Sequence, residues 1–115
     1  GSKQRFASAQ LIALFEGELW RESAAHANSM ATRLRAALVD ATATGRLTFT
    51  QETQSNAVFA RLPFAAAETL RARFGFYDWA GPFADGTVEV RWMCSWDTTT
   101  ADVDAFAEAI TGALA

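Results

Sequence analysis

The stretch that decides the fold is Val88-Glu89-Val90-Arg91-Trp92-Met93-Cys94-Ser95-Trp96-Asp97-Thr98-Thr99-Thr100. Its first part alternates between large apolar and polar residues, which predicts a β-strand over residues 87–96. The Asp/Thr-rich end predicts a helix starting near Thr99 or Thr100, because Thr99 and Asp102 have the spacing of a capping box. Arg91 sits within this strand. An arginine on a rigid strand is well suited to bind a carboxylate with two parallel hydrogen bonds.

The alternation assigns the side chains of this strand to two faces. One face is apolar and is predicted to be core: Val88, Val90, Trp92, Cys94 and Trp96. The other face is mixed and is predicted to meet solvent, a partner subunit or another domain: Glu89, Arg91, Met93 and Ser95. The simplest alternative for Arg91 is an ordinary strand arginine paired with Glu89 or a nearby carboxylate.

Outward from this strand, the pattern predicts an α+β fold, with N-terminal helices followed by a small, mostly antiparallel sheet in the order ββαββα and helices on one face. The helical pattern runs from about Arg5 to Ala43, as a short helix, a bend near Gly17 and a longer helix to about Leu38 or Val39. The other predicted elements are strands at 47–50, 56–62 and 76–79 and a helix at 64–74, with Pro63 in its first turn and Gly75 ending it.

Two segments are expected. Residues 1–43 form a helical lead-in that connects to a missing large domain, and residues 44–115 form the small α+β domain. So long a helical opening is unusual for a compact domain. We therefore expect the lead-in helices to leave apolar surface uncovered, which favours self-association.

Composition bounds the function. The 115 residues are half apolar, with nine phenylalanines and four tryptophans, enough for one packed domain. A net charge of −3 and scattered basic residues argue against nucleic-acid binding, and no apolar run is long enough for a membrane span. The single cysteine, Cys94, rules out an internal disulfide and fits a cytoplasmic protein.

The remaining candidate residues have plain structural interpretations. His26 is the only histidine and is expected to be a helix-surface or packing residue, so no metal site is assigned. Cys94 is expected to be a buried, inert thiol. Tyr77 and Trp79 either pack in the core or line a cleft.

The chain resembles the C-terminal part of the low-specificity L-threonine aldolases, which are pyridoxal-phosphate (PLP) enzymes of the aspartate-aminotransferase fold type. Segments in order along nearly the whole chain carry the resemblance: residues 3–10, Leu19-Trp20, residues 26–31, residues 56–59, Phe76-Tyr77-Asp78-Trp79 and residues 91–104 with Asp97-Thr98-Thr99.

The resemblance implies a parent about three times this length, with a PLP-binding domain before this segment, and a small amino acid as substrate. The reaction is cleavage of threonine or allo-threonine to glycine and acetaldehyde, in a cytoplasmic homo-oligomer. Arg91 matches the arginine that binds the substrate carboxylate. Arg5, and more weakly Lys3, match positions near the PLP phosphate, although Ser2-Lys3-Gln4-Arg5 replaces the usual Gly-rich run.

The lysine that binds PLP covalently is not in this chain, because Lys3 is its only lysine and lies elsewhere in the family pattern. The isolated chain is therefore expected to be inactive and to hold no PLP. Two alternatives remain open: a stand-alone α+β regulatory or ligand-binding module, and the small domain of another PLP lyase or aminotransferase. The carboxylate-binding arginine is common to such enzymes and does not select the reaction.

Overall fold

The structure is a computed structural model that describes the backbone of residues 4–5 and 17–115 and the side chains from residue 21 onward. A four-stranded antiparallel sheet has the order β2-β3-β6-β5, formed by β2 (Thr48–Phe49), β3 (Ala57–Pro63), β6 (Thr87–Met93) and β5 (Tyr77–Ala80). The helices are α1 (Gly17–Ala37), α2 (Val39–Thr42), α3 (Phe64–Arg71) and α4 (Thr100–Ala113). This arrangement confirms the predicted α+β class.

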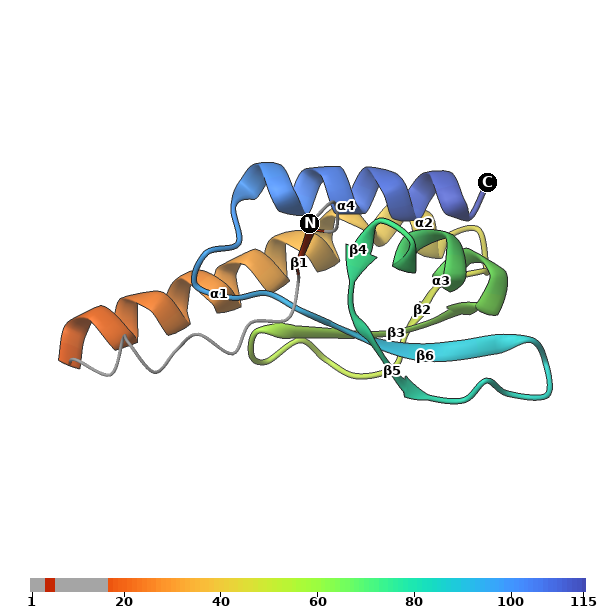
Figure 1. Cartoon of the computed structure of the whole chain (residues 1–115), viewed down its shortest axis with the longest axis horizontal. Helices are drawn as coiled ribbons and strands as arrows, with labels where there is room; N and C mark the ends of the chain where they lie inside the picture. Colours follow the sequence, from red (N-terminus) through yellow and green to blue (C-terminus); the bar gives the residue numbers. More distant parts are fainter. Residues whose placement is uncertain (1–3, 6–16) are drawn as a thin grey trace.

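Helices cover one face of the sheet. In Figure 1 the helices α1 and α4 run side by side along this face, and α3 packs against β3, β6 and α4. Burial alternates along the central strands β3 and β6, as expected for a sheet covered on one face. Val88, Val90 and Trp92 of β6 point into the core. Glu89 and Arg91 lie on the opposite face, which none of the described helices covers and which we call the open face.

An aromatic cluster joins α4 to the sheet. The Phe106 ring of α4 lies edge-on to Trp92 of β6 at 5.2 Å between ring centroids, and 4.7 Å from Phe74. Phe76 contacts both Phe106 and Trp92 at 6.2 Å. Edge-to-face contacts of this kind add to the stabilisation that burial provides.

The predicted capping box at the start of α4 is present. The Thr99 side chain accepts a hydrogen bond from the Asp102 backbone N–H at 3.0 Å, and Asp102 Oδ2 accepts one from the Thr99 backbone N–H at 3.0 Å. These bonds satisfy two N–H groups that a helix start would otherwise leave without partners. Their position fixes where the chain turns from β6 into α4.

Two predictions about local structure are wrong. Arg5 belongs to a strand, β1 (Gln4–Arg5), which pairs in parallel with β4 (Phe74–Gly75). The helix predicted over residues 64–74 is also too long, because α3 stops at Arg71 and Phe74 and Gly75 form β4. Pairing between segments distant in sequence, together with the burial of Phe74 against Phe106, overrides the local helical pattern. Gly17 begins α1, and the short helix predicted before it lies outside the described residues.

The lead-in helices pack on the domain itself. Within residues 21–43 the apolar side chains Met30, Leu34 and Leu38 belong to the same core as the sheet, and the large apolar side chain that remains exposed is Val39. The expectation that these helices leave a broad apolar surface uncovered is therefore wrong for the described residues. The division of the chain at residue 43 stays a prediction.

Replacing Phe106 tests whether the aromatic cluster holds α4 to the sheet. We expect Phe106→Ala to lower the free energy of unfolding by about 3–5 kcal/mol, because it removes a fully buried ring and leaves a cavity. Phe106→Leu should cost less, since it keeps most of the volume. Urea unfolding measures both variants, and a loss below about 1 kcal/mol for Phe106→Ala would contradict the assignment.

A bidentate ion pair between Arg33 of α1 and Asp104 of α4 predicts acid sensitivity. Hydrogen bonds from Arg33, at 3.0 and 2.9 Å, hold the pKa of Asp104 below its ordinary value. The folded pKa is thus below the unfolded one, so the stabilisation is present above the unfolded pKa, about 4, and is lost as the pH falls through the folded pKa.

We therefore expect Asp104→Asn to be destabilising at neutral pH and nearly neutral in acid. Unfolding free energies near pH 7 and near pH 2 measure the difference. Glu108→Gln is the control, because Glu108 is an exposed carboxylate of the same helix with no described partner. An equal effect of Asp104→Asn at both pH values would rule the interaction out.

Candidate functional site

Arg91 lies at the centre of the open face. It occupies the middle of β6, with Phe59 of β3 opposite it on one side and Tyr77 of β5 opposite it on the other. The core residues Val90 and Trp92, which flank it in sequence, are fully buried. The strand backbone is therefore fixed from the other side of the sheet, and Arg91 projects from a rigid support.

The Arg91 guanidinium lies over an aromatic ring and has no acidic partner among the side chains that the structure describes. Its Cζ atom lies 4.9 Å from the ring centroid of Trp79. Its Nε atom is buried and makes no hydrogen bond, and no described residue accepts a hydrogen bond from its terminal nitrogens, which are not buried. Glu89 does not pair with it but accepts a hydrogen bond from Thr50 Oγ1 at 2.5 Å. The simple alternative, a salt bridge with a neighbouring carboxylate, is absent among the described side chains.

Arg91 is not the only described arginine without an ion pair. Arg35 and Arg46 donate hydrogen bonds to backbone oxygens, and the exposed Arg73 lies against the Phe74 ring. Arg33, Arg61 and Arg71 each form ion pairs, with Asp104, Asp85, and Glu68 and Asp78 respectively. A half-buried cation without a counter-charge is costly, so its retention at a fixed position indicates a site for an external anion. Arg91 combines that availability with a planar fork that matches a carboxylate.

Two exposed aromatic side chains border Arg91. Trp79 and Tyr77 are 51% and 66% exposed, and the Trp79 ring meets Phe59 edge-on at 5.2 Å and 77°. Of the two options that the sequence left open for Tyr77 and Trp79, core packing is therefore excluded. They lie instead on the face that carries Arg91.

The structure places the backbone of Arg5 beside β4, on the helix side of the sheet, where the neighbouring Phe74 packs against Phe106 of α4 (Figure 1). Arg5 pairs with Gly75 of β4, two residues before Tyr77, which is the strand partner of Arg91. The side chain of Arg5 and the whole of Lys3 lie outside the described residues, so their roles at a phosphate remain predictions.

His26, Cys94 and Trp96 have structural positions. His26 is exposed, and its Nε2 lies 2.5 Å from the backbone oxygen of Thr98, linking α1 to the turn before α4. Cys94 is buried as predicted. Trp96 was predicted to be core but is 39% exposed, because β6 ends at Met93 and the turn after it breaks the alternation.

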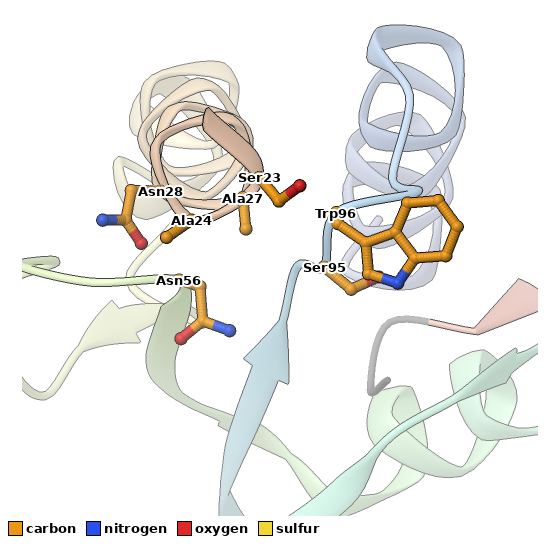
Figure 2. A pocket seen from close by; sticks show the side chains of 7 residues that line it. All are labelled: Ser23, Ala24, Ala27, Asn28, Asn56, Ser95 and Trp96. Carbon is orange, nitrogen blue, oxygen red and sulfur yellow. The ribbon is translucent and has the colours of Figure 1, made fainter. Parts of the chain in front are cut away.

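Sequence reasoning missed a small pocket at the other end of the sheet. Figure 2 shows it between α1, the start of β3 and the segment after β6. Its volume is about 150 Å³, and its lining residues are Ser23, Ala24, Ala27, Asn28, Asn56, Ser95 and Trp96. Because these come from three distant segments, no local pattern marks them. Arg91 does not line this pocket.

Metal-binding and membrane-spanning features were also sought. Within the described ranges, no group of three or more histidine, cysteine or acidic residues could hold a metal ion. The described helices include none with the length and apolar character to cross a membrane.

Similar proteins identify the class. The chain is 38% identical over 103 residues to a low-specificity L-threonine aldolase of Pseudomonas sp. and 40% identical over 98 residues to that of Pseudomonas aeruginosa. These matches cover 89% and 84% of the chain but only 28% and 26% of the relatives. A threonine aldolase structure from Leishmania major superimposes with a TM-score of 0.74 and 30% identity, over 90% of this chain and 29% of that one. No protein-family model matches the chain.

The fold and the open-face arginine thus occur in a domain related to part of a larger enzyme. The chain is homologous to the C-terminal small domain of the low-specificity L-threonine aldolases, which confirms the resemblance seen in the sequence. It spans only about a quarter of their length.

The environment of Cys94 predicts a thiol that does not react in the folded protein. Burial raises the pKa of Cys94 to about 12, so the nucleophilic thiolate is essentially absent near pH 8. We expect no labelling by iodoacetamide in the native chain and complete labelling in urea, measured by mass spectrometry. Rapid labelling of the native chain would show that the site opens to solvent.

Proposed function

We propose that this chain acts as the small domain of a PLP-dependent threonine aldolase, in which Arg91 binds the α-carboxylate of the amino-acid substrate. The observation that carries the proposal is the Arg91 guanidinium on the open face, which no described carboxylate pairs with, in a domain homologous to threonine aldolases. A substrate carboxylate would supply the missing acceptor and neutralise the charge.

The geometry supports a two-pronged contact. A carboxylate offers two acceptor oxygens in a plane, which match two parallel N–H groups of a guanidinium. With Nε buried, the accessible donors of Arg91 are the two terminal Nη groups. The fixed backbone of β6 then determines where the carboxylate sits.

Two residues at the start of this chain are proposed to contact PLP. Parallel pairing places the Arg5 backbone beside Gly75 of β4, two residues before Tyr77, which is the β5 residue opposite Arg91. On the strength of the resemblance, we propose that Arg5 and Lys3 hold the PLP phosphate while Arg91 holds the substrate. The lysine that bonds to PLP would come from an N-terminal domain outside this chain, because Lys3 does not match its position in the family.

In the proposed reaction, PLP supplies an electron sink for the electron pair released when the Cα–Cβ bond of threonine breaks. The contribution of this chain is orientation. Arg91 anchors the carboxylate on Cα, which limits how the other bonds of Cα can rotate. Products are glycine and acetaldehyde. Selection of the bond that breaks is left to groups outside this chain, so the chain alone should be inactive.

We further propose that the complete protein is a cytoplasmic homo-oligomer. The resemblance supports the oligomer, because in several members of the family the arginine near the phosphate comes from a neighbouring subunit. The single, unpaired and buried Cys94 supports the cytoplasmic location. A molecular mass of one chain by light scattering would contradict the oligomer, and recovery of the native protein in the membrane or secreted fraction would contradict the location.

The activity of the complete reading frame tests the proposal. With PLP we expect it to cleave L-threonine, measured as acetaldehyde by a coupled NADH assay, whereas the 115-residue chain with PLP should not. Arg91→Lys should lower kcat/KM by about 100-fold, because a point charge replaces a bidentate fork.

Arg61→Lys is the matched control, since Arg61 lies on the same face but is paired with Asp85. It should keep activity within about threefold, a change of less than 1 kcal/mol that is typical of exposed ion pairs. Absence of aldolase activity in the complete protein would favour a stand-alone module or another PLP reaction. Full activity of Arg91→Lys would exclude Arg91 as the carboxylate group.

A further inference from the structure

The strand β5 has an irregular register at Trp79. Asp78 lies opposite Val90 of β6, but Ala80 lies opposite Glu89, one residue short of regular pairing. Trp79 is therefore the extra residue of a β-bulge. Bulges bend a strand and redirect a side chain, and they are frequent beside active sites.

The redirected ring has two specific neighbours. The Trp79 ring lies 4.9 Å from Arg91 Cζ and meets the Phe59 ring edge-on at 5.2 Å. Phe59 is itself the β3 residue opposite Arg91. Three adjacent strands thus contribute one residue each to this group, in which Trp79 contacts both Phe59 and Arg91.

Trp79 is not a core residue. Half of this large ring is open to solvent, whereas Trp92 on the other face is fully buried. The neighbouring residue Asp78 is tied to Arg71 of α3 on the helix side of the sheet. This ion pair keeps Asp78 on that side, which leaves Trp79 on the open face with Arg91.

We propose that Trp79 is a positioning residue, which holds the Arg91 guanidinium by stacking so that its two terminal Nη groups point to the substrate carboxylate. This inference rests on the proposed function of Arg91. Stacking uses the flat face of the guanidinium and leaves the N–H groups in its plane free to bind. The edge-on contact with Phe59 limits how the Trp79 ring can rotate.

The physical gain is pre-organisation. A free arginine side chain has several rotamers, and binding must select one of them. The stack selects that rotamer before the substrate arrives. It acts equally on bound substrate and transition state, so its loss should raise KM and leave kcat nearly unchanged.

Kinetics of the complete enzyme test the inference. For Trp79→Leu we expect KM for L-threonine to rise about 3- to 30-fold with kcat within about twofold, in line with the strength of a cation–π contact. Trp79→Phe keeps an aromatic face and should recover most of the loss.

Phe83→Leu is the matched control, because the Phe83 ring lies under Arg61 and not under Arg91. The distance from its centroid to Arg61 Cζ is 4.1 Å. Its KM should match that of the unaltered enzyme. An unchanged KM in Trp79→Leu would overturn the inference. So would a joint fall in kcat and thermal stability that Trp79→Phe does not reverse, since this would indicate a purely structural role.

A second measurement on the 115-residue chain does not depend on activity. The Nε–H proton of Arg91, assigned by comparison with Arg91→Lys, should be shifted by the ring current of Trp79 and should lose that shift in Trp79→Leu. The same resonance position in both proteins would show that the ring does not hold Arg91. If Trp79→Leu loses the shift but the complete protein has no aldolase activity, the contact between Trp79 and Arg91 is supported and the proposed function is contradicted.

Discussion

The pairing of β6 with β3 on one side and β5 on the other is the interaction on which the rest of the structure depends. β6 is one of two central strands, and its alternating side chains serve two purposes at once. Those on one face close the core beneath α1, α3 and α4, and those on the other face present Arg91. Because neighbouring side chains on a strand point in opposite directions, burial of Val90 and Trp92 fixes the direction of Arg91.

The two faces of the sheet are therefore linked mechanically. Trp92 packs against Phe76 and against Phe106 of α4, so the core holds the strand rigid from behind. On the open face, Trp79 contacts both Phe59 and Arg91 over the same strands. A tightly packed core has little freedom to deform, and this rigidity is what a carboxylate-binding arginine needs in order to act as a fixed anchor.

Much of the fold could be predicted from the sequence. The periodicity located α4, β3 and β6 to within a few residues, and the spacing of Thr99 and Asp102 gave the capping box. Long, regular patterns succeed because the local signal and the tertiary environment agree. The predictions failed where structure is short and non-local. A two-residue strand such as β1 exists only because β4 lies beside it, and Trp96 leaves the core because the strand ends before it.

For the site, the sequence by itself determined that Arg91 stands on the polar side of a strand and that Lys3 is the only lysine of the chain. Period-2 alternation and composition are enough for both conclusions. Only the tertiary structure decided that Arg91 has no acidic partner among the described side chains, that Glu89 bonds to Thr50, and that the Arg91 guanidinium lies over the Trp79 ring. These features depend on strand register and on a bulge in β5, and register is set by the packing of the whole sheet.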